Sequence, residues 1–129
     1  DATLAIFGAP VTLDNPDDDA LAAARTIAGR LIREVPECPA GIGVAAGQVV
    51  AGNVGANERF EYTVIGEPVN EAARLSELAK VRTGPRVLAC ADTVAAASAD
   101  EQRCWEMGES VTLRGYEQPT LLATLTRLS

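Results

Sequence analysis

An asparagine and an arginine four residues apart are the side chains of this sequence best placed to act on a phosphate group. Asn70 and Arg74 lie in the segment GEPVNEAARL, residues 66–75, where an apolar stripe of helical spacing begins. Four residues make about one helical turn, so both side chains project from one face of the helix. A hydrogen-bonding amide beside a permanent cation suits a group that gathers negative charge on phosphate oxygens. The structural alternative is an asparagine near a helix start and an arginine paired with Glu71 or Glu77.

The elements around this pair follow from the apolar pattern. A strand-like run over residues 60–65 leads through Gly66 into a helix that we expect from Val69 to about Lys80. Pro68 suits the first turn of that helix, and the helix ends before residues 83–85, which read Thr-Gly-Pro. The pair is therefore expected to project from a helix that directly follows a strand.

The rest of the chain alternates strands and helices. The pattern predicts helices at residues 20–34 and 91–98, and strands at 2–7, on either side of a turn near Gly47, at 86–90, at 103–107, and in a closing hairpin of 111–113 with 121–126. We therefore expect an α/β (α+β) sandwich, with a mostly antiparallel sheet and helices on one face. The carboxylates of residues 17–19 are interpreted as a solvated helix start rather than a metal site.

Composition narrows the possible functions. A length of 129 residues favours a single domain, and the net charge of −7 argues against nucleic-acid or anionic-membrane binding. The absence of histidine excludes Ser-His-Asp and Cys-His sites from this segment, so any metal would be held by carboxylates, as suits Mg²⁺ or Mn²⁺. Three scattered cysteines make no disulfide framework and are expected to be idle thiols in a reducing compartment. No apolar run is long enough to span a membrane, and the start does not resemble a signal peptide.

Several motifs in this order resemble the class III nucleotide cyclase catalytic domain. They are FGAP at 7–10, GIGV at 41–44, GQVVAGNVG at 47–55 and YTVIGEPVNEAARL at 62–75. The resemblance covers nearly the whole chain, from Asp1 to about Leu125, and implies a ferredoxin-like cyclase fold. The chain begins with Asp and has no Met before Met107. We therefore expect residues 1–129 to form one partial catalytic domain that lacks its N-terminal strand and helices.

The resemblance also implies roles for individual residues. Asn70 would orient the ribose and Arg74 would stabilise charge on the α-phosphate. Thr63 matches the purine-reading position and favours ATP over GTP, because a hydroxyl can accept from the adenine amino group, although it can also donate. Arg114 is a candidate substitute for a phosphate-binding lysine. Asp1 matches one of two aspartates that hold two divalent metal ions, Mg²⁺ or Mn²⁺.

The remaining parts of the family's site are expected outside this segment. The other metal aspartate and a purine-reading lysine should both precede Asp1. Residues 53–60 correspond to the family's dimerisation arm, and Arg59 and Phe60 are interpreted as contacts there. The family works as a head-to-tail homodimer with its active sites at the interface.

These observations predict an adenylyl cyclase catalytic domain that converts ATP to cyclic AMP and pyrophosphate for intracellular signalling. We expect a cytoplasmic segment without membrane contact of its own; a membrane anchor elsewhere in a longer protein stays open. Residues 1–129 alone are expected to be inactive, because half of the metal site would be missing. The first alternative is a degenerate cyclase-homology domain that binds nucleotide or dimerises without catalysis. A second is an unrelated ferredoxin-like binding module.

Overall fold

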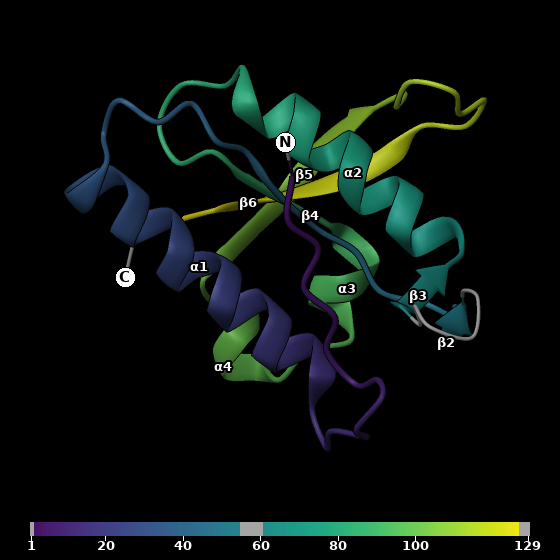
Figure 1. The fold of residues 1–129 in the computed structure, drawn as a ribbon. Helices are drawn as coiled ribbons and strands as arrows, with labels where there is room; N and C mark the ends of the chain where they lie inside the picture. The colour runs from purple at the N-terminus through teal and green to yellow at the C-terminus, as the bar shows by residue number, and fades with distance from the viewer. Residues whose placement is uncertain (1, 55–60, 127–129) are drawn as a thin grey trace.

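The structure, a computed structural model, describes residues 2–54 and 61–126 (Figure 1). In chain order, the elements of these residues are α1 (Pro16–Glu34), β1 (Ile42–Val44), β2 (Val50–Val54), β3 (Glu61–Ile65), α2 (Glu67–Lys80), β4 (Val87–Cys90), α3 (Ala91–Ala95), α4 (Ala99–Gln102), β5 (Trp105–Val111) and β6 (Thr120–Leu125). This mixture of helices and strands confirms the expected α+β class.

Four of the strands form one sheet in the order β1-β4-β6-β5. β1 pairs with β4 in parallel, with Gly43 opposite Leu88, whereas β4–β6 and β6–β5 are antiparallel. β5 and β6 form a closing hairpin, but β5 (105–111) combines most of the strand predicted at 103–107 with only the first residue of the hairpin arm predicted at 111–113. β2 and β3 pair only with each other among the described residues, as a separate antiparallel ribbon. The two strands that flank Gly47 are therefore present as predicted, but they join different sheets.

Helices cover both faces of the main sheet rather than one (Figure 1). Val87 and Ala89 of β4 pack in one core cluster with Leu21, Ala24 and Ala28 of α1. Leu88, between them in sequence, packs in a second cluster with Leu75 and Ala79 of α2. Successive side chains of a strand point to opposite faces, so α1 and α2 lie on opposite sides of β4. The expectation of helices on one face is wrong, because the apolar stripe of a helix does not specify the face of the sheet against which the helix packs.

The close approach of α2 to β1 depends on glycine. A Cβ atom added to Gly43 would lie 2.2 Å from the carbonyl oxygen of Ala72 and 2.6 Å from the backbone nitrogen of Ser76. One added to Gly41 would lie 2.2 Å from the carbonyl oxygen of Ser76. These atoms belong to the backbone of α2, which cannot give way as a flexible side chain can. Glycine at both positions therefore sets how closely α2 lies on the sheet.

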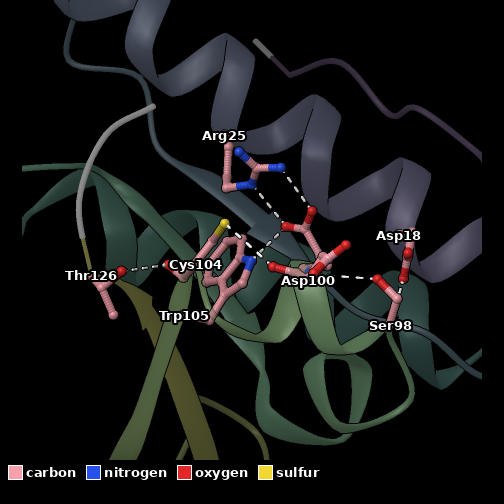
Figure 2. A network of polar contacts seen from close by, with 8 residues as sticks. Asp18, Arg25, Ser98, Asp100, Cys104, Trp105 and Thr126 are labelled. Carbon is pink, nitrogen blue, oxygen red and sulfur yellow. Dashed lines mark hydrogen bonds and ion pairs between the residues drawn. The ribbon is translucent and has the colours of Figure 1, made fainter.

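A polar network joins α1 to the segment from α4 to β5 (Figure 2). Nε and Nη2 of Arg25 donate to the two carboxylate oxygens of Glu101 at 2.8 and 2.7 Å. Trp105 donates its indole N–H to the same carboxylate at 2.9 Å, and both Glu101 and Trp105 are buried. Nearer the start of α1, Asp18 accepts from the backbone N–H of Ser98 at 2.7 Å. Hydrogen bonds from Ser98 lower the pKa of the Asp18 carboxyl.

Three further boundaries differ from the sequence-based expectation. Helix α1 begins at Pro16 instead of residue 20, and the carboxylates of residues 17–19 lie in its first turn. The helix expected at 91–98 ends at Ala95 as α3, a second short helix, α4, follows at 99–102, and β5 runs on to Val111. Proline in the first turn and carboxylates near the N-terminus both favour the earlier start of α1.

The strand expected at residues 2–7 is absent from the structure. Leu4 is 55% exposed and Phe7 is 36% exposed, although the alternation of large and small apolar residues over 2–7 is typical of a strand. A strand is defined by a hydrogen-bonded neighbour as well as by its apolar pattern. Among the described residues, none pairs with this segment, so the expectation of a strand here is wrong.

Candidate functional site

The site is built on the first two turns of α2. The helix follows Gly66, with Pro68 in its first turn, so Asn70 comes near the helix start and Arg74 one turn later. Both side chains line an open cleft of about 520 Å³, as their four-residue spacing predicts. The opposite wall of the cleft is the turn between β5 and β6, residues 114–118, and Glu67 completes the lining.

Arg74 connects α2 to that turn. Its Nε donates to the carbonyl oxygen of Arg114 at 3.2 Å, and its Nη1 donates to Oε1 of Glu77 at 3.2 Å. Arg114 donates from Nη2 to the same Glu77 oxygen at 3.1 Å. The Glu77 pairing that the sequence left as an alternative is therefore present. Nη2 of Arg74 has no hydrogen-bond partner among the described residues, and the side chain is 33% exposed to the cleft and solvent.

Arg114 lies in the same cleft as Asn70 and Arg74, although 40 residues separate it from Arg74. Its side chain is 72% exposed, so the guanidinium is held mainly by Glu77. Asn70 is exposed and makes no side-chain hydrogen bond to the described part of the chain. An exposed amide, two guanidiniums and an open cleft can together bind an anion that carries hydrogen-bond acceptors.

Tyr116 is a cleft residue that the sequence analysis missed. Its ring packs against the α2 cluster, and its hydroxyl is buried with no hydrogen-bond partner of normal geometry in the described residues. Burial, and then the neighbouring Glu67 carboxylate, raise the pKa of this phenol. A lone tyrosine inside a polar turn was the only sequence signal, and it gave no indication of burial.

Cys90 lies at the end of β4, beneath α2. Burial, and then a hydrogen bond to Glu71, raise the pKa of its thiol to about 11. Cys38 and Cys104 are also free thiols. The prediction of unpaired cysteines is confirmed, and Cys90 is protonated at neutral pH.

Other predicted site residues lie wholly or partly outside the described structure. Asp1, Arg59 and Phe60 are outside the described residues. Thr63 is in β3, opposite Gly52 of β2, and only its backbone is described. Over residues 2–54 and 61–126, no group of three or more acidic or cysteine side chains could hold a metal ion. In the same residues, no helix is both long and apolar enough to cross a bilayer.

Comparisons with known sequences give close but uncharacterized relatives. The chain is 67% identical over 126 residues to the uncharacterized protein Rv1319c of Mycobacterium tuberculosis and to Mb1353c of Mycobacterium bovis. It is 68% identical over 123 residues to the uncharacterized protein Rv1318c of Mycobacterium tuberculosis. These matches cover 95–98% of this chain, which spans 23% of the length of those relatives. No protein-family profile matches the sequence.

Solved structures of three cyclases have a fold similar to that of this chain. The guanylyl cyclase Cya2 superposes with a TM-score of 0.68 at 26% identity, over 95% of this chain and 64% of that one. The adenylyl cyclase CyaB from P. aeruginosa gives a TM-score of 0.64 at 22% identity, over 94% of this chain and 65% of that one. A bacterial light-regulated adenylyl cyclase gives 0.64 at 22% identity, over 85% and 34%. The chain therefore has the fold of these adenylyl and guanylyl cyclases.

Proposed function

We propose that this chain is part of a nucleotide cyclase that converts ATP to cyclic AMP and pyrophosphate. The observation that carries the proposal is the placement of Asn70 and Arg74, which line one cleft together with Arg114. The fold shared with solved adenylyl and guanylyl cyclases supports it. In such a fold, an amide and two cations facing one cleft are suited to a nucleoside triphosphate.

The proposed reaction is an intramolecular displacement at the α-phosphorus. The ribose 3′-oxygen forms a bond to phosphorus, the bond to the bridging oxygen of the β-phosphate breaks, and pyrophosphate leaves with that electron pair. The proton of the 3′-hydroxyl is released to solvent. Asn70 would hold the ribose so that the 3′-oxygen faces the α-phosphorus, which saves the entropy of orientation. Arg74 would stabilise charge on the α-phosphate oxygens, and Arg114 would contact the outer phosphates.

Divalent ions belong to the proposal as its cofactors. Two Mg²⁺ or Mn²⁺ ions, with Asp1 as one ligand, would neutralise charge on the triphosphate. Asp1 lies outside the described residues, and within those residues no group of three or more acidic or cysteine side chains could hold a metal ion. The contribution of Asn70 and Arg74 depends on their own positions in the cleft.

A homodimer is also part of the proposal. The β2–β3 ribbon is separate from the main sheet, and Val50 and Ile65 face each other across it. They are 74% and 63% exposed, so an apolar pair lies on the surface of this protein. Contact with a protein partner would remove this apolar pair from water, and in our proposal the partner is a second copy of the chain in a head-to-tail homodimer.

Replacement of Arg74 by alanine in the complete protein tests the function. We expect cyclic AMP formation to fall by about 10²–10³-fold, the usual cost of removing a group that stabilises transition-state charge. Arg30→Ala is the matched control, because Arg30 pairs with Glu34 on the exposed side of α1. Assays with ATP and GTP side by side decide the substrate, which Thr63 predicts to be ATP.

Two outcomes would contradict this assignment. An Arg74→Ala variant with unchanged output would remove Arg74 from the reaction. A wild-type protein that binds nucleotide but forms no cyclic product from ATP or GTP would favour the degenerate cyclase-homology domain.

A further inference from the structure

Glu77 lies between the two guanidiniums of the cleft. A single oxygen, Oε1, accepts from Nη1 of Arg74 at 3.2 Å and from Nη2 of Arg114 at 3.1 Å. Glu77 is on α2, three residues beyond Arg74, whereas Arg114 belongs to the turn between β5 and β6. The carboxylate therefore joins two cations that come from distant parts of the sequence.

Without a carboxylate between them, these guanidiniums would repel each other. Arg74 also donates Nε to the carbonyl oxygen of Arg114, which brings the two residues into direct contact. Two like charges this close favour separation, and Arg114, at 72% exposed, is free to turn toward solvent. A shared anion removes the repulsion and gives both side chains one common point of attachment.

Solvent exposure limits the strength of this attachment. Glu77 is 52% exposed, and exposed ion pairs contribute little to stability. The pairs are consequently strong enough to bias where the cations point and weak enough to be exchanged for a phosphate group. Such a carboxylate orients the site and also competes with an anionic ligand for the same donors.

We infer that Glu77 is a positioning residue that holds Arg74 and Arg114 together, ready for the phosphates of the nucleotide. This inference rests on the proposed function, since it concerns the cations assigned there to the triphosphate. Glu77 itself does not contact the reacting atoms; it acts through the two arginines.

The test is Glu77→Gln in the complete protein, with kcat and KM measured separately. We expect kcat to fall about fivefold, which is the scale of a surface ion pair. We expect KM to fall about twofold, because one negative charge beside the phosphates is gone. Glu106→Gln, an exposed residue of β5, makes the same change in charge and should alter neither constant.

A double-mutant cycle separates positioning from a general loss of structure. In an Arg114→Ala background, Glu77→Gln should lower kcat by about twofold or less, because one of its two partners is already absent. Equal falls of kcat in both backgrounds, or a kcat within twofold of wild type after Glu77→Gln alone, would overturn the inference.

Binding of inorganic triphosphate distinguishes failure of this inference from failure of the proposed function. If the wild-type protein forms no cyclic nucleotide, the proposed function fails, but the binding measurement still decides the role of Glu77. Tighter binding by about threefold in Glu77→Gln supports a carboxylate that occupies the anion donors. Unchanged or weaker binding of inorganic triphosphate by Glu77→Gln would overturn the inference about Glu77.

Discussion

The guanidinium of Arg74 illustrates how one side chain can have both a structural contact and a chemical role. Nε bonds the β5–β6 turn through the carbonyl oxygen of Arg114, and Nη1 bonds Glu77 of the same helix, while Nη2 has no partner in the described residues. Two fixed nitrogens determine the plane of the group, and arginine keeps its charge at any physiological pH. The structural interpretation of Arg74 and the functional one are therefore compatible.

Also at the scale of single residues, the raised thiol pKa of Cys90 predicts that the stability of the fold depends on pH in the alkaline range. Burial, and then a hydrogen bond to Glu71, raise its thiol pKa from 9.0 to about 11. A raised pKa means that the folded state favours the neutral thiol. This contribution is complete below pH 9 and is lost as the pH rises to about 11.

We expect the difference in unfolding free energy between wild type and Cys90→Ala to become smaller as the pH rises. Because the thiol is only half-buried and partly screened by solvent, the difference in unfolding free energy should shrink by about 1 kcal/mol over that range. Urea denaturation at a series of pH values measures it. Parallel profiles of the two proteins would show that the Cys90 pKa is the same in the folded and unfolded states.

At the scale of elements, the position of α2 on the sheet decides where the site residues lie. The first turns of α2 carry Asn70 and Arg74, and its far face packs through Leu75 and Ala79. Gly41 and Gly43 allow its backbone to lie directly against β1. Any group that separates α2 from β1 should therefore also displace the amide and guanidinium from the β5–β6 turn.

Gly43→Ala tests this coupling between packing and site. The new methyl group would meet two backbone atoms of α2 at 2.2 and 2.6 Å. We expect the unfolding free energy to fall by about 2 kcal/mol, as in other overpacked cores, and the cyclase activity proposed here to fall with it. Gly52→Ala is the control, since its Cβ would meet nothing within 4 Å. Equal stabilities of the two variants would show that α2 does not require the close approach.

At the scale of the whole molecule, the sheet separates two apolar clusters. One lies under α1 and α3, and the other lies under α2. The hydrogen bonds of Glu101 with Arg25 and Trp105 link α1 to β5, although Arg25 and Glu101 are 76 residues apart in the sequence. Both charges are largely buried, so removal of one partner leaves the other in a poorly solvated position.

Glu101→Ala should therefore destabilise the fold as a whole. Loss of the carboxylate removes the acceptor of the two hydrogen bonds that Arg25 donates to Glu101 and of the Trp105 indole N–H, and we expect a loss of about 3 kcal/mol in unfolding free energy. Glu34→Ala breaks the exposed ion pair between Glu34 and Arg30 on α1, and should lower the unfolding free energy by less than about 1 kcal/mol. Similar losses measured by urea denaturation would contradict a stabilising role for the buried network.

The sequence by itself determined the fold class, most of the elements and the facing pair on α2. Helical spacing places Asn70 and Arg74 on one side, and the turn residues Gly66 and Pro68 mark where their helix begins. These features depend on local geometry, which neighbouring residues in the chain specify. The closing hairpin was predictable for the same reason.

Only the tertiary structure decided the contacts between distant segments. Nothing in the local pattern places Arg114 beside Arg74, buries the hydroxyl of Tyr116, or sets α1 and α2 on opposite faces of β4. The strand expected at residues 2–7 also depended on a neighbour that its own residues could not supply. Such features arise from packing and pairing across the chain, and a local pattern does not specify its partner.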